Sequence, residues 1–132
     1  MKQTALLTTT SVITLLLAIL HLTDDIVFKI SPGGLSNLTF VLISVVWLYG
    51  TLVLAERRAG YIIILLGSLV ALGVSAIHMR GAGMVGGRVG ATSEAFFWVW
   101  TLLTLGVTAS FSGVLSARAL WNLPWRRQRR PG

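Results

Sequence analysis

Residues 59–79 read AGYIIILLGSLVALGVSAIHM, a stretch of 21 residues without a single Asp, Glu, Lys or Arg. An α-helix rises 1.5 Å per residue, so a helix of about 20 residues crosses the ~30 Å hydrocarbon core of a bilayer. A strand of a membrane barrel alternates polar and apolar residues, whereas residues 61–66 (YIIILL) do not alternate. The stretch therefore predicts a helix that crosses a membrane.

Three further charge-free runs lie on either side of this stretch, at residues 3–23, 30–55 and 95–117. Each run is long enough to span a bilayer as a helix. We predict an all-α integral membrane protein, a four-transmembrane-helix bundle that forms a single membrane domain over residues 1–132. The expected helices cover residues 6–23, 38–55, 61–78 and 95–117, followed by a basic tail at residues 118–132.

Composition excludes most other classes of protein. Apolar residues make up 55% of the 132 residues and charged residues 11%, whereas a soluble domain carries about 25% charged residues. The hydrophobicity also argues against disorder. The net charge of +7 does not indicate nucleic-acid binding, because the basic residues form no folded basic face. The absence of cysteine excludes disulfides, thiolate-zinc sites and redox thiols.

Basic residues are distributed unequally between the two predicted ends of the bundle, eight against three. Lys and Arg near short loops favour the cytoplasmic side, so we predict cytoplasmic N- and C-termini in a multi-pass protein of the plasma membrane. The basic tail is expected to anchor the chain to anionic lipid. The eight are Lys2, Arg57, Arg58, Arg118, Arg126, Arg127, Arg129 and Arg130, and the three are Lys29, Arg80 and Arg88.

Both histidines are predicted to lie at the same height, near the outer membrane surface. His21 follows Lys2 by 19 residues and His78 follows Arg58 by 20, and both helices are expected to run outward. Asp24 and Asp25 follow His21 at i+3 and i+4, so they share a helix face with it. Glu94 begins the fourth predicted helix on the same side, which predicts a polar cluster at the extracytoplasmic rim.

Three interpretations of this cluster remain open. Imidazole and carboxylate groups suit a divalent transition metal such as Zn, Fe, Mn or Cu. Two histidines at one height could instead ligate haem, or one of them a chlorin, in an electron-transfer or pigment subunit. Without a cofactor, the acids would solvate or cap helix ends. The candidate ligands are His21, Asp24, Asp25, His78 and Glu94, and Arg80 and Arg88 are candidates to hold an anion or support the ligands.

Small residues recur on the third and fourth predicted helices, for example Gly67, Ala71 and Ser75 at four-residue spacing. Such lines let membrane helices approach closely, so we expect these two helices to pack together. They could also serve a homo-oligomer or larger membrane-protein subunits, which makes a cofactor-free accessory subunit the alternative function. We expect Trp98 and Trp100 at the membrane interface. No residue pattern indicates a catalytic nucleophile, and whether the protein is an enzyme stays open.

Overall fold

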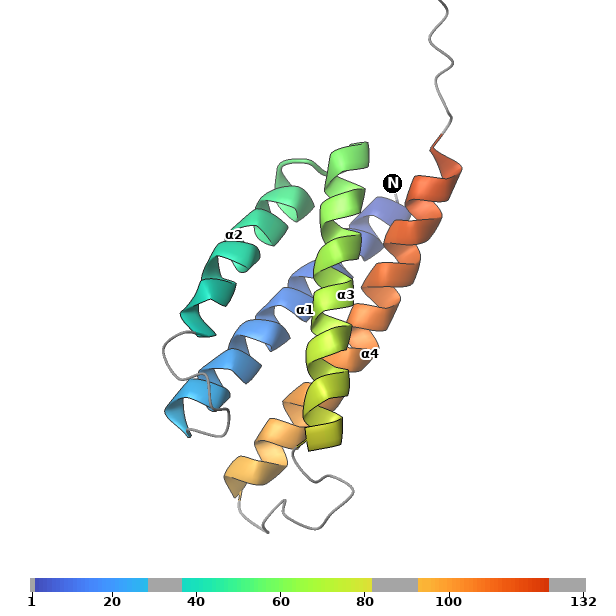
Figure 1. The fold of residues 1–132 in the computed structure, drawn as a ribbon. Helices are drawn as coiled ribbons and strands as arrows, with labels where there is room; N and C mark the ends of the chain where they lie inside the picture. Colours follow the sequence, from blue (N-terminus) through green and yellow to red (C-terminus); the bar gives the residue numbers. More distant parts are fainter. Residues whose placement is uncertain (1, 29–36, 82–92, 124–132) are drawn as a thin grey trace, which may run out of the picture.

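The computed structural model describes residues 2–28, 37–81 and 93–123. These residues form four α-helices and no strand: α1 (Lys2–Val27), α2 (Thr39–Leu52), α3 (Arg58–Gly81) and α4 (Ser93–Asn122) (Figure 1). The prediction of an all-α bundle is therefore confirmed for the described part of the chain. The four charge-free runs were enough to locate all four helices, because the rest of the chain has no charge-free segment of comparable length.

Three of the helices are long and apolar enough to cross a membrane, over Gln3–Val27, Arg58–Met79 and Phe96–Asn122. The second helix differs from the expected 38–55, because α2 has 14 residues and ends at Leu52. At 1.5 Å per residue it rises about 21 Å, less than a bilayer core. The chain turns at residues 53–57, where Glu56 has a positive φ of 65°. Apolar composition continues to Ala55, so it did not indicate this turn.

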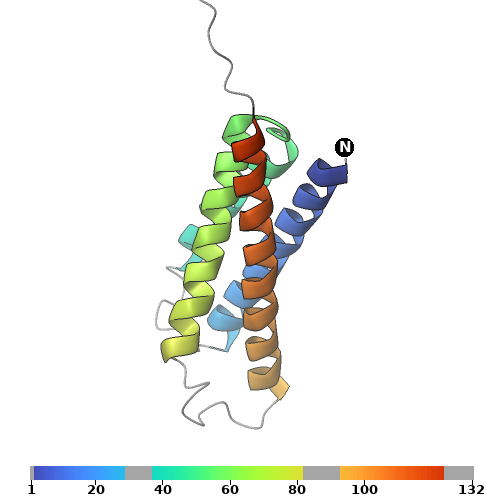
Figure 2. The ribbon, with the colours of Figure 1, turned by 90° about the vertical axis from the view of Figure 1, so that its right-hand side faces the viewer.

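Successive helices run in opposite directions (Figure 1). One end of the bundle, which we call the site end, contains the last turns of α1 and α3 and the first turns of α2 and α4. Helices α3 and α4 lie side by side in both views and make the most extensive contact of any described helix pair (Figures 1 and 2). The expected close approach of these two helices is therefore confirmed. Helix α1 crosses them obliquely (Figure 2).

The buried residues of the three long helices recur at alternating spacings of four and three. This spacing keeps one helix face turned toward its partners, as in a coiled coil. Both histidines lie on these buried stripes, at the site end. The stripes are Leu7, Ser11, Thr14, Ala18, His21 and Asp25 on α1; Ile64, Ser68, Ala71, Ser75 and the partly exposed His78 on α3; and Trp98, Leu102, Leu105, Ala109, Ser112 and Ser116 on α4.

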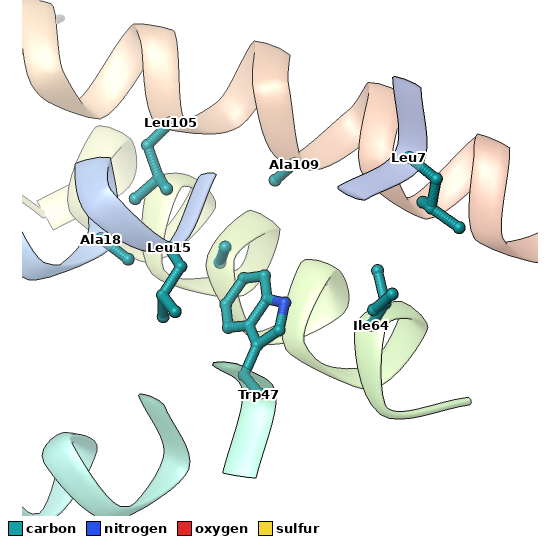
Figure 3. Packing of buried hydrophobic residues seen from close by; sticks show 8 residues of the cluster. Leu7, Leu15, Ala18, Trp47, Ile64, Leu105 and Ala109 are labelled. Carbon is teal, nitrogen blue, oxygen red and sulfur yellow. The ribbon is translucent and has the colours of Figure 1, made fainter. Parts of the chain in front are cut away.

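Trp47 attaches the short helix α2 to the rest of the bundle. Its side chain reaches from α2 into the core, toward Leu15 and Ile64 (Figure 3). The indole Nε1–H donates to Ser11 Oγ at 2.9 Å, which satisfies its donor inside the bundle. The ring packs so closely on Gly67 that an added Cβ would overlap it. Gly67 therefore serves the contact with α2, whereas Ser75 faces α4 and donates to the Leu102 carbonyl at 3.3 Å.

Candidate metal centre

His21, Asp25 and His78 come together at the site end of the bundle. Each offers one possible ligand atom, and these three atoms lie within 4.8 Å of one another. His78 Nε2 lies 3.3 Å from Asp25 Oδ2, and His21 Nε2 lies 3.9 Å from the same oxygen. The prediction that the two histidines share one height is confirmed, because their ring centroids are 5.0 Å apart.

The helix register decides which aspartate joins the histidines. Neighbouring residues on an α-helix point about 100° apart, since 3.6 residues make a turn. Asp25 continues the buried stripe of α1 one turn beyond His21, and it is 5% exposed. Asp24 points away from this stripe and is not a member of the three-residue group. Of the two aspartates that the spacing left open, the fold brings Asp25 to the histidines.

Trp98 completes the polar centre from α4. Its Nε1–H donates to Asp25 Oδ1 at 2.8 Å, which leaves Oδ2 directed at the histidines. Its ring centroid lies 5.2 Å from that of His21 and 5.6 Å from that of His78. The expectation of an interfacial Trp98 is wrong, since its side chain is only 3% exposed. The signal that could have identified it is the spacing to Leu102 and Leu105, which continues the buried stripe of α4.

A hydrogen bond to its own helix determines the tautomer of a neutral His78. The ring Nδ1 lies 2.9 Å from the Val74 carbonyl oxygen, and because a carbonyl only accepts, Nδ1 carries the hydrogen. The lone pair of a neutral ring is then on Nε2, which faces Asp25 Oδ2 at 3.3 Å. Two acceptors at this distance repel each other unless a proton or a cation lies between them.

His21 is the most isolated polar group of the centre. The residue is 2% exposed, and neither ring nitrogen has a hydrogen-bond partner among the described residues. Burying a polar group without a hydrogen bond costs on the order of 1–3 kcal/mol, and most buried polar side chains have a partner. The imidazole therefore has unused capacity to bind an ion or another ligand.

A cavity of about 310 Å³ adjoins all three side chains. It lies among α1, α2 and α3, with one residue contributed by α4. Its polar lining residues all lie near the site end, where Leu22 and Phe40 also line it, and the lining farther in is apolar. The lining consists of His21, Asp25, Asn37, Thr39 and His78, together with Ala18, Leu22, Phe40, Ile43, Ala71, Val74 and Leu105.

The other predicted site residues are not brought into the centre by anything that the structure describes. The backbones of Arg80 and Glu94 belong to α3 and α4, but their side chains lie outside the described residues. Arg88 and the tail arginines Arg126, Arg127, Arg129 and Arg130 also lie outside them. Their expected roles as anion holder, further ligand and lipid anchor stay predictions.

Comparison with known proteins adds no relative to this description. No protein-family model matches the chain, and no curated protein and no solved structure matches it. The geometry of the centre is consequently the basis on which a function can be inferred.

Proposed function

We propose that this chain is a multi-pass membrane protein that binds one divalent transition-metal ion through His21, Asp25 and His78. The observation that carries the proposal is the buried His21 imidazole, which lies beside a carboxylate and a second histidine and has no hydrogen-bond partner in the part of the chain that the structure describes. A metal ion would bind one of the two unpartnered nitrogens of His21 and would also separate the facing acceptors of His78 and Asp25.

The distances suit a small ion. Zinc binds imidazole nitrogen and carboxylate oxygen at about 2.0–2.2 Å, so tetrahedral ligand atoms lie about 3.3 Å apart. The two distances to Asp25 Oδ2, 3.3 Å and 3.9 Å, come close to this arrangement, and binding an ion would draw together the three atoms that now lie within 4.8 Å. Two histidines and one carboxylate with an open position are typical of catalytic zinc and of non-haem iron(II). A haem or a chlorin is disfavoured, because the two histidine rings contact each other edge to face at 89° and Trp98 packs against both. These contacts leave no space for a large ring between the histidines.

Hydrogen bonds to two of the three ligands, His78 and Asp25, support the same interpretation. Metal-binding histidines usually donate their second N–H to a carbonyl or carboxylate, as His78 does to Val74. Ligating carboxylates are likewise held by hydrogen bonds, and Trp98 holds Asp25. Such partners orient the ligand atoms before an ion arrives.

A protonated His78 paired with Asp25 is the competing account. That ion pair would satisfy these two side chains, and it would agree with a cofactor-free accessory subunit. It leaves both ring nitrogens of the buried His21 without a partner among the described residues, however. The metal site explains His21, His78 and Asp25 together, and we therefore prefer it.

Membrane insertion is supported by the outer surface of the bundle. Large apolar side chains are exposed on every described helix, as expected for contact with lipid and not with water. Arg57 and Arg58 lie at the end opposite the proposed metal centre, and the positive-inside rule therefore favours an extracytoplasmic position for the centre. Representative exposed residues are Leu16 (56%), Leu42 (70%), Ile77 (70%), Phe111 (62%) and Val114 (67%).

Elemental analysis of the detergent-purified chain tests the proposal directly. We expect about one transition-metal ion per chain after purification without chelator, and less than a tenth of that in His21→Ala. Thr23→Ala is the matched control, since Thr23 is an exposed residue of the same helix whose hydroxyl donates to the Ile19 carbonyl. A wild-type chain that neither retains nor takes up metal would contradict the proposal, and co-purification with larger chains would then favour the accessory subunit.

Trp98→Phe should weaken metal binding without removing a ligand. The substitution keeps an aromatic ring against the histidines but deletes the hydrogen bond to Asp25 Oδ1. Loss of such a supporting partner typically lowers metal affinity about 10–100-fold. Titration against a chromogenic chelator measures the change. Trp100→Phe on the same helix is the control, because Trp100 is 57% exposed, and equal effects of the two variants would argue against the role of Trp98.

A further inference from the structure

The polar residues that line the cavity beside the proposed metal centre all lie at one end of it. The three proposed ligands lie at the site end, and Asn37, just before α2, and Thr39, its first residue, line the same region. Ala18 lies one helical turn inward from His21, and Ala71 lies two turns inward from His78. The inner lining is completed by apolar side chains of all four helices. A ligand that fits this space has one polar end and one apolar end.

The charge of the proposed centre indicates which polar end it prefers. A divalent ion bound by one carboxylate and two neutral imidazoles retains a net charge of +1. Among the residues that line the cavity, Asp25 alone is an acid, and it is already used as a ligand. A retained positive charge in apolar surroundings is unfavourable, so an anionic group at the remaining coordination position is favoured.

The size of the cavity, which is partly open, sets the scale of the ligand. At the ~30 Å³ that one water molecule occupies in the liquid, a cavity of about 310 Å³ holds roughly ten non-hydrogen atoms. A straight-chain acid of eight carbons has ten. The inner wall offers it aliphatic contacts, and burial of each methylene is favourable.

We propose that the open position of the metal binds the carboxylate of a medium-chain aliphatic acid, whose chain lies in the apolar part of the cavity. This inference rests on the proposed metal site. It gives a function to the cavity, which the three ligands do not require for holding an ion. The ligand would reach the site from the membrane, where an acid of this kind is soluble.

The full-length chain loaded with cobalt(II) in detergent provides the test. Tetrahedral cobalt(II) absorbs visible light, and the absorption changes when its fourth ligand changes. We expect octanoate to alter the spectrum at a concentration at least tenfold lower than acetate does. Octanol, which has the same chain without the charge, should leave the spectrum unchanged. The detergent should itself be neutral and free of carboxylate.

A cavity-filling variant separates binding in the cavity from partition into the micelle. Ile43 lines the cavity from α2, a helix that contributes none of the three ligands. Ile43→Trp should keep the cobalt spectrum and lose the preference for octanoate over acetate. Ala18→Leu fills the opposite wall and serves as a second variant if the first folds poorly.

The possible failures are distinguishable. If no cobalt is bound, both the metal site and this inference are overturned. If cobalt is bound but octanoate acts no better than acetate, the metal site stands and the carboxylate inference is wrong. An unchanged preference in cobalt-loaded Ile43→Trp or Ala18→Leu would also overturn it, since the chain would then lie outside the cavity.

Discussion

Asp25→Asn is expected to lower metal affinity more than about 100-fold, whereas Asp24→Asn leaves it near the wild-type value. Asparagine keeps the size of Asp25 and an oxygen that accepts from Trp98, but it removes the only negative charge of the three-residue group. The loss should exceed the ~10–100-fold typical of a supporting residue, because an anionic ligand is lost. Competition with a chromogenic chelator measures both affinities.

The pair of adjacent aspartates makes this a controlled comparison. Both substitutions remove one negative charge from the same helical turn, so a general electrostatic effect would appear in both variants. Only the direction of the side chain differs, since Asp25 lies on the buried stripe of α1 and Asp24 does not. Metal loss in Asp24→Asn alone would show that the register at the end of α1 is wrong.

Gly67→Ala is expected to lower the free energy of unfolding by about 1–3 kcal/mol, the usual cost of overpacking a close contact. A Cβ at this position would overlap the indole ring of Trp47, which is itself held by Ser11. Either α2 shifts away from α3 or the Trp47 hydrogen bond breaks. Equilibrium unfolding in mixed detergent and SDS measures the change, and Trp fluorescence reports on the ring.

Gly73→Ala is the matched control on the same helix. No heavy atom lies within 4 Å of a Cβ added at Gly73, so the variant meets no steric obstacle. Alanine is the better helix former by up to about 1 kcal/mol, and the control should be neutral or slightly more stable. Equal destabilisation of both variants would contradict the packing of Trp47 on Gly67. A partial rescue of Gly67→Ala by Trp47→Ala would support it.

Much of the fold could be predicted without coordinates, because the cost of placing charge in a bilayer is large and local. Charge-free runs located four helices, and the distance of each histidine from a basic residue placed His21 and His78 at one height. The same local information could not find the end of α2. Residues 53–55 are as apolar as the helix before them, and the turn depends on a close contact in which Gly60 packs on the carbonyls of Leu54 and Gly50.

The sequence indicated only part of the proposed metal centre. The chain has few histidines and aspartates, so they stand out in the sequence. The alternating spacing of four and three residues, had it been applied, would have predicted that Asp25 and Trp98 are buried and that Asp24 lies off the buried face. Which helices face one another is a different matter. Small polar residues such as Ser11, Ser68 and Ser112 lie on the buried face of each long helix, but they do not indicate which helix it packs against. Only packing in three dimensions brings α1, α3 and α4 together at one end. The meeting of His21, Asp25, His78 and Trp98 therefore depends on tertiary contacts, whereas the membrane helices that carry them follow from hydrophobicity and length.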